Sequence, residues 1–275
     1  MTIKTRNRIL LVFFTISLLI LTANIIQFVY ASFHNGITPP LNPIRNFVPF
    51  KSWGPFAYNF NAAIIGCFAF CVYVSSVSII IYATFEKTQS IEVIYFTLFL
   101  FGCIFESLRL LIAEFSLWQT YSNLLISIGK SIIGGRILAP LSLFFAAIFS
   151  ESSQRQNVER NILMLIVVSI GLSVLYPLNT LYTTSTCAVA WGYSKLFFIV
   201  RLFILLATLV TMIFNAVNNN SKTMIRSIIG FVLLASGYLI LIGTDCFFNL
   251  FLGIGLLSTG TVLYLRSTHL IYMWN

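Results

Sequence analysis

Long uninterrupted apolar runs constrain this chain more than any other feature. Eight such runs, separated by polar segments, each hold about the 20 apolar residues that a helix needs to cross the hydrocarbon core of a bilayer. Hydrophobic residues make up 59% of the 275 residues and charged residues only 8%, whereas soluble domains carry roughly 25% charged residues. A water-soluble core could not bury this much apolar surface, so we expect lipid to cover it. The sequence therefore predicts an all-α, polytopic bundle of transmembrane helices.

The pattern predicts one transmembrane helical domain over residues 1–275. The longest polar connection is an outer loop at 32–59, where several prolines forbid a long helix. A surface loop is the favoured interpretation of this segment, and a lid over a pocket is the alternative. The helices are expected at about 9–31, 60–85, 91–113, 130–150, 162–182, 195–217, 225–243 and 247–265.

The first apolar run admits two interpretations. It follows Lys4, Arg6 and Arg8 and ends at Val29-Tyr30-Ala31, where a signal peptidase would find small or aliphatic residues. The run is longer than the apolar region of a usual signal peptide, which favours a retained first helix. Cleavage would leave seven helices and an outer N-terminus.

The distribution of lysine and arginine predicts the orientation. With the N-terminus inside, only Arg45 and Lys51 fall in outer loops. Nine basic residues then fall on the inner side, namely Lys4, Arg6, Arg8, Lys87, Arg155, Arg160, Lys222, Arg226 and Arg266. Because this bias sets the topology of multi-pass proteins, we expect cytoplasmic N- and C-termini in a cell-membrane protein. The net charge of +9 has the same cause and gives no reason to expect a nucleic-acid partner.

Four charged residues lie inside the apolar runs. Glu106 and Arg109 belong to the third run, Arg136 to the fourth and Arg201 to the sixth. At 1.5 Å per residue, Arg109 would lie about 6 Å below the outer membrane edge and the other three roughly 9 to 10 Å below it. A charge at such a depth costs a few kcal/mol, usually faces the bundle interior and marks a functional site. We therefore expect one layer of charge near the outer face.

This layer predicts an anion-binding site. The carboxylate cancels one guanidinium group, so two positive charges remain, and arginine suits forked contacts with carboxylate or phosphate. We expect a small anion or a lipid head group to bind from outside, with neutral contacts from two amides on the first helix. In the competing interpretation each arginine reaches out to lipid phosphates and the amides bond to neighbouring helices. The predicted ligand-binding residues are Asn24, Gln27, Glu106, Arg109, Arg136 and Arg201.

The sequence gives little support to enzymatic or cofactor chemistry. Its two histidines, His34 and His269, fall outside the spans, so we expect neither a haem nor a metal site. No Gly-x-Ser-x-Gly motif and no paired aspartates within a helix supply a nucleophile. Cys187 and Cys246 fall in outer turns, where an oxidising compartment would permit a disulfide.

Three functions fit these features, and the first is favoured. A receptor-like sensor or binding protein would bind a small anion and pass its state to a separate cytoplasmic or membrane partner. A small-anion transporter would need a polar path through the inner half and helix breaks at Pro140 and Pro177. A structural subunit of a membrane complex would direct its arginines toward lipid head groups.

Overall fold

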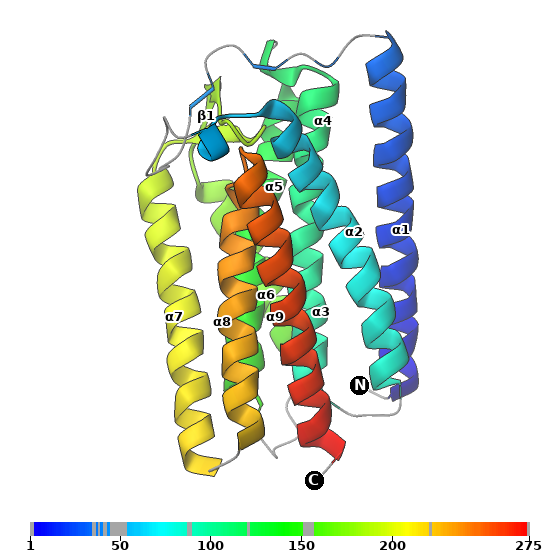
Figure 1. The fold of residues 1–275 in the computed structure, drawn as a ribbon, viewed down its shortest axis with the longest axis vertical. Helices are drawn as coiled ribbons and strands as arrows, with labels where there is room; N and C mark the ends of the chain where they lie inside the picture. Colours follow the sequence, from blue (N-terminus) through cyan, green and yellow to red (C-terminus); the bar gives the residue numbers. More distant parts are fainter. Residues whose placement is uncertain are drawn as a thin grey trace.

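The chain folds as a bundle of long helices that stand side by side (Figure 1). Eight helical segments of the described chain are long and apolar enough to cross a membrane, which confirms the predicted all-α class and number of helices. The first helix begins and the last helix ends at the same end of the bundle, which we call the terminal end. The opposite end carries a β-hairpin at 178–191 and is called the hairpin end. The computed structural model describes residues 3–34, 37, 39–40, 43–44, 54–86, 90–119, 122–150, 157–219 and 222–273.

The helices follow one another in sequence order, and the hairpin comes between α6 and α7. The long helices are α1 (Ile3–His34), α2 (Phe60–Phe85), α3 (Ile91–Ile104) with its continuation α4 (Leu108–Glu114), α5 (Asn123–Ile148), α6 (Val158–Leu175), α7 (Ser194–Asn219), α8 (Lys222–Ile242) and α9 (Phe247–Met273). The hairpin consists of β1 (Leu178–Thr183) and β2 (Val189–Trp191), and the 3₁₀ turns are η1 (Gly54–Phe56), η2 (Phe105–Ser107) and η3 (Leu117–Gln119).

Two predicted helix boundaries are wrong in ways that affect the site. The fourth helix begins at Asn123 instead of near residue 130, because the side chain of Ser122 caps it by accepting a hydrogen bond from Leu125 N at 3.2 Å. Arg136 therefore lies near the middle of α5, roughly 20 Å from its first residue. The fifth helix ends at Leu175 instead of near 182, since a residue before proline is driven out of helical geometry.

The remaining helix ends move less, and the third helix is interrupted by η2. The first helix covers 3–34 where 9–31 was predicted, and the third covers 91–104 and 108–114 where 91–113 was predicted. The fifth helix begins at 158 and not at 162. The last three helices cover 194–219, 222–242 and 247–273, where 195–217, 225–243 and 247–265 were predicted. The predicted outer loop at 32–59 lies largely outside the described residues, as do the basic residues Arg45, Lys51, Lys87 and Arg155.

The hairpin replaces what the sequence suggested was a helix end followed by an exposed loop. Its strands pair antiparallel, with Leu178 opposite Trp191. The segment that joins them, residues 184–188, is buried and is called the hairpin loop. Ser185 Oγ donates to an Asp245 carboxylate oxygen at 3.0 Å, and the backbone oxygen of Asp245 accepts from Asn59 N at 2.8 Å. These bonds tie the loop to the turn between α8 and α9 and to the start of α2.

Close helix contacts occur at glycine, as expected for membrane bundles. A Cβ atom on Gly135 of α5 would lie 2.7 Å from the backbone oxygen of Gly102 in α3, and one on Gly260 of α9 would lie 2.3 Å from Leu234 N in α8. Gly255, also on α9, has no atom within 4 Å of its Cβ position. Only some of the glycines in these helices therefore bring neighbouring helices together.

Candidate functional site

Glu106 lies in the 3₁₀ turn that interrupts the third span. Ser107 Oγ donates to the backbone oxygen of Ile104 at 2.7 Å within the same turn. Because a 3₁₀ helix has three residues per turn, side chains at i and i+3 eclipse one another. The turn therefore aligns Glu106 with Arg109 more closely than a continuous α-helix would. Both side chains are buried, each residue being 1% exposed.

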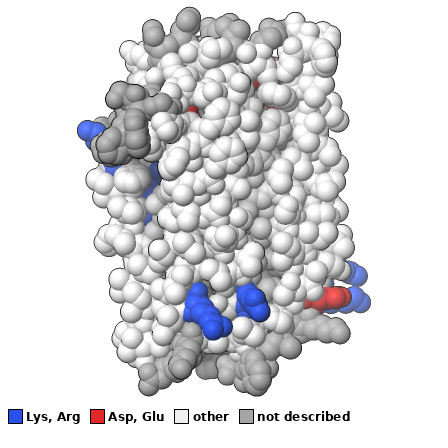
Figure 2. Space-filling model, viewed as in Figure 1, with Lys and Arg blue, Asp and Glu red and all other residues white. Residues whose placement is uncertain are grey.

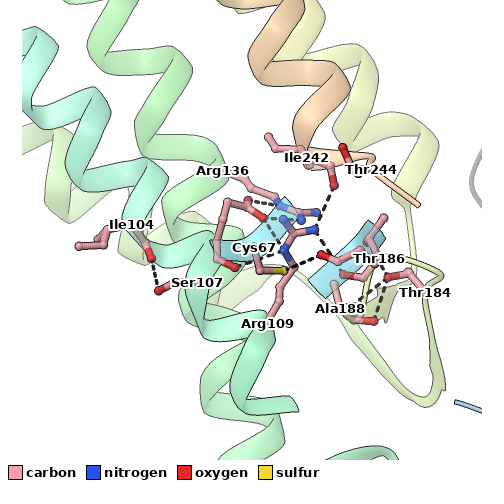
Figure 3. Close-up of polar contacts among 12 residues, drawn as sticks. Cys67, Ile104, Ser107, Arg109, Arg136, Thr184, Thr186, Ala188, Ile242 and Thr244 are labelled. Carbon is pink, nitrogen blue, oxygen red and sulfur yellow. Dashed lines mark hydrogen bonds and ion pairs between the residues drawn. The ribbon is translucent and has the colours of Figure 1, made fainter. Parts of the chain in front are cut away.

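The carboxylate of Glu106 accepts hydrogen bonds from one guanidinium group and forms an ion pair with a second (Figure 3). Arg136 of α5 donates from Nε to Oε1 and from Nη2 to Oε2, the second contact at 2.8 Å. The ion pair is with Arg109, whose Nε lies 3.0 Å from Oε2. Two guanidinium groups thus flank one carboxylate, so these three residues carry one excess positive charge. The sequence predicted that these three residues share a height, and the structure brings their charged groups into contact.

Arg109 also connects three parts of the fold (Figure 3). Its Nη1 donates to the backbone oxygen of Thr186 in the hairpin loop at 3.3 Å and to that of Ile242 at the end of α8 at 3.1 Å. Its Nε donates to the backbone oxygen of Glu106 at 3.2 Å. Helix C-termini carry carbonyl groups without an intrahelical partner, so Arg109 satisfies one of these at α8. Its contacts are those of a structural clamp.

Arg201 reaches the same region from α7 but forms no ion pair there. It is 7% exposed, and its Nε and Nη1 have no hydrogen-bond partner within the described ranges. Its guanidinium carbon lies 5.0 Å from the ring centroid of Phe197. It interacts electrostatically with both Arg136 and Glu106. With three arginines and one glutamate, the cluster carries two formal positive charges, and Arg201 is its least neutralised member.

Aromatic rings cover this cluster on the side of the hairpin. The guanidinium carbon of Arg136 lies 4.8 Å from the ring centroid of Trp191 in β2, a cation–π contact. Phe197 packs edge-on against Trp191 at 5.0 Å and against Tyr176 at 5.2 Å. Partial burial raises the pKa of the Tyr176 hydroxyl, which donates to the backbone oxygen of Tyr193. Sequence reasoning missed these aromatic contacts, although Trp191-Gly192-Tyr193 stands out in a Thr-rich segment.

The two predicted amide ligands are not part of the cluster. Asn24 is buried, and its Nδ2 donates to Cys71 Sγ at 3.8 Å. Gln27 is half-buried and has no hydrogen bond to the described residues. The structure therefore brings together Glu106, Arg109 and Arg136, places Arg201 beside them, and leaves the amides elsewhere on α1.

Two charged groups outside the cluster, Glu114 and Lys130, are buried or bound to backbone oxygens. Glu114, at the end of α4, is 4% exposed, and neither carboxylate oxygen has a partner among the described residues. Lys130 Nζ donates to backbone oxygens at the end of α6, including that of Val174 at 2.7 Å, which is a favourable position for a cation. Both Cys187 and Cys246 are buried, and Cys187 is a free thiol, so the possible disulfide between them is not formed. Burial raises the pKa of the Cys187 thiol.

The inner half of the bundle is less free of charge than expected. Glu92, in the first turn of α3, and Arg6, in the first turns of α1, are both buried at the terminal end. Arg6 Nη2 donates to the backbone oxygen of Phe85 at the end of α2 and to that of Glu86 at 3.3 Å. Arg6 thus satisfies carbonyl groups at a helix C-terminus.

The cluster as a whole thus combines a buried guanidinium group, whose Nε and Nη1 have no partner in the part of the chain that the structure describes, with a network that carries excess positive charge. Comparisons with protein-family models, with curated proteins and with solved structures found no match to this chain.

Proposed function

We propose that this chain is a non-enzymatic, receptor-like or binding protein of the cell membrane. A small anion or an anionic head group would bind at Arg201 and Arg136, on the side of the membrane opposite the cytoplasmic termini. Glu106 and Arg109 would fix the geometry of the site. A separate cytoplasmic or membrane partner would read the state of the bundle.

The supporting observation is that Nε and Nη1 of Arg201 have no hydrogen-bond partner among the described residues. A buried charge without a counter-ion is costly, and the one carboxylate of the cluster, that of Glu106, is already shared by Arg109 and Arg136. An anion at Arg201 would remove this imbalance. Carboxylate and phosphate are the favoured classes, because guanidinium groups form their strongest hydrogen bonds with such oxygens.

A small-anion transporter is the second candidate, and one observation favours it. The third span is interrupted by η2 at Glu106, and transporters often bind their substrates at interrupted helices. The breaks expected at the two prolines are not seen, since α5 continues through Pro140 and Pro177 follows the end of α6. The third candidate, a structural subunit, would direct its arginines toward lipid head groups. Arg109 and Arg136 instead contact groups inside the bundle, which favours a binding site.

The test compares the thermal stability of the purified protein in phosphate, succinate and chloride at equal ionic strength. Phosphate or succinate should raise the Tm of the wild type, and Arg201→Gln should abolish this shift. Arg201→Gln loses no hydrogen bond within the described chain, so without anions its Tm should equal or exceed that of the wild type. Arg226→Gln, at an exposed position on α8, is the matched control and should keep the shift.

Equal anion responses in all three proteins, or none in the wild type, would contradict the proposal. Uptake of radiolabelled phosphate or succinate into proteoliposomes then separates the first two candidates. Uptake that depends on Arg201 would favour transport, and anion stabilisation without uptake would favour a receptor.

A further inference from the structure

A large apolar groove lies between α2 and α9, and none of the charge-cluster residues lines it. Its cavity volume is about 670 Å³, within the 300–1,000 Å³ that ligand pockets commonly have. Val72 and Ile80 line it from α2, Leu257 and Val262 from α9, and Leu241 of α8 also contributes. The lining extends along α2 from residue 65 to residue 84, roughly 28 Å at 1.5 Å per residue. This is close to the hydrocarbon thickness of a bilayer, about 30 Å.

Polar groups in this groove are either satisfied or gathered at one end. Tyr73 Oη and Thr261 Oγ1, in its middle, hydrogen-bond to each other at 2.7 Å, so this part offers little to a polar ligand. Arg266 and His269, near the end of α9, line the groove toward the terminal end together with Thr84 of α2. Arg266 is exposed and forms no ion pair within the described ranges.

The surface around the groove has the same polarity. The middle of the face in Figure 2 is almost entirely uncharged, and basic side chains appear toward the terminal end. α2 and α9 diverge toward that end in Figure 1. An apolar groove of membrane length that ends in an exposed guanidinium group has the chemistry of a phospholipid site, since acyl chains need apolar walls and phosphates pair with arginine.

We propose that the groove binds an anionic glycerophospholipid from the leaflet on the side of the termini. An acyl chain lies between α2 and α9, and the lipid phosphate is held by Arg266 and His269. The phosphate charge of an anionic lipid such as phosphatidylglycerol is not offset by a cationic head group, as it is in a zwitterionic lipid, so its attraction to Arg266 is stronger. Glu86, two residues beyond Thr84, is not part of the lining.

The test uses native mass spectrometry of the purified protein with two lipids that share the same chains, palmitoyl-oleoyl phosphatidylglycerol and palmitoyl-oleoyl phosphatidylcholine. The wild type should retain phosphatidylglycerol several-fold better. Arg266→Gln should reduce its retention to the level of phosphatidylcholine. Arg226→Gln, which removes an exposed cation outside the groove, should leave the preference unchanged.

A second pair of variants tests the groove itself. Ser76 is exposed and lines the groove, so Ser76→Trp places an indole inside it. Ile79 is also exposed on α2 but does not line the groove, so Ile79→Trp is the matched control. Only Ser76→Trp should lower retention of phosphatidylglycerol. Equal retention of both lipids by the wild type, or equal losses in Arg266→Gln and Arg226→Gln, would overturn the proposal. A lipid-free dimer that Ser76→Trp dissociates would overturn it too, because a second copy of the chain would then occupy the groove.

Discussion

Replacing Glu106 by glutamine should destabilise the bundle strongly. The carboxylate accepts two N–H donors from Arg136 and forms an ion pair with Arg109, and the hydrogen bonds of the Arg136 side chain within the described ranges go only to this carboxylate. Glutamine keeps the shape of the side chain but leaves both guanidinium groups buried without a counter-charge. Removing one partner of a buried ion pair costs about 3–5 kcal/mol. We expect Glu106→Gln to lower the free energy of unfolding by this amount.

A double-mutant cycle separates the stranded charge from the lost contact. Arg136→Met alone leaves Glu106 paired with Arg109 at 3.0 Å, so it should cost only about 1.5–3 kcal/mol, the value of hydrogen bonds to a charged group. In the double variant the stranded guanidinium of Arg136 is gone. Its destabilisation should therefore fall short of the sum of the single values by about 1–3 kcal/mol.

The assay is reversible unfolding by sodium dodecyl sulfate in dodecyl maltoside micelles, followed by circular dichroism. Glu86→Gln, at an exposed carboxylate at the end of α2, is the control and should stay within about 0.5 kcal/mol of the wild type. The reasoning fails if Glu106→Gln also stays within that range, or if the two single losses add without coupling.

Two further predictions concern packing and orientation. Gly260→Ala should lower the free energy of unfolding by about 1–3 kcal/mol in the same assay, because the new Cβ would lie 2.3 Å from the backbone of α8. Gly255 has open space around it, so Gly255→Ala should raise the free energy of unfolding by about 0.5–1 kcal/mol. Equal effects of the two substitutions would contradict the packing argument. The native cysteines are buried, so an introduced cysteine can report the orientation by its labelling with a membrane-impermeant maleimide. With cytoplasmic termini, intact cells should label Leu181→Cys, at a position that is 85% exposed at the hairpin end. Lys4→Cys should be labelled only after lysis. Labelling in the reverse order would refute cytoplasmic termini, and loss of the Lys4→Cys label from the mature protein would show that the first helix is cleaved.

The sequence predicted the helices and the charge layer because both depend on residue type. A run of about 20 apolar residues can satisfy its backbone in lipid only as a helix, and so the number of helices was predicted correctly. Glu106 cannot reach solvent from its span, so a contact with the nearby arginines was a sound expectation. The contact between Glu106 and Arg136 depends on the packing of α3 against α5 at Gly102 and Gly135, which spacing alone does not show.

The hairpin was missed although a signal for it was present. Pro177 lacks a backbone N–H and disfavours helical geometry at Tyr176, so the fifth helix should have been ended there. The six residues of β1, LNTLYT, do not alternate regularly between apolar and polar, so they gave no indication of a strand. The contacts of Arg109 with backbone oxygens of Thr186 and Ile242 could not be predicted, because every residue offers such an acceptor.

The hairpin loop links the charge cluster to the turn between α8 and α9 by hydrogen bonds. Arg109 joins Glu106 to the loop and to the end of α8, and Ser185 joins the loop to Asp245 at the turn into α9. A ligand that moved Glu106 would therefore change contacts at the α8–α9 turn as well. A ligand shifts a conformational equilibrium only by the difference in its affinity for the two states. Arg201, whose Nε and Nη1 have no partner within the described chain in this state, is the group from which such a difference would arise, and this is why the anion test centres on it.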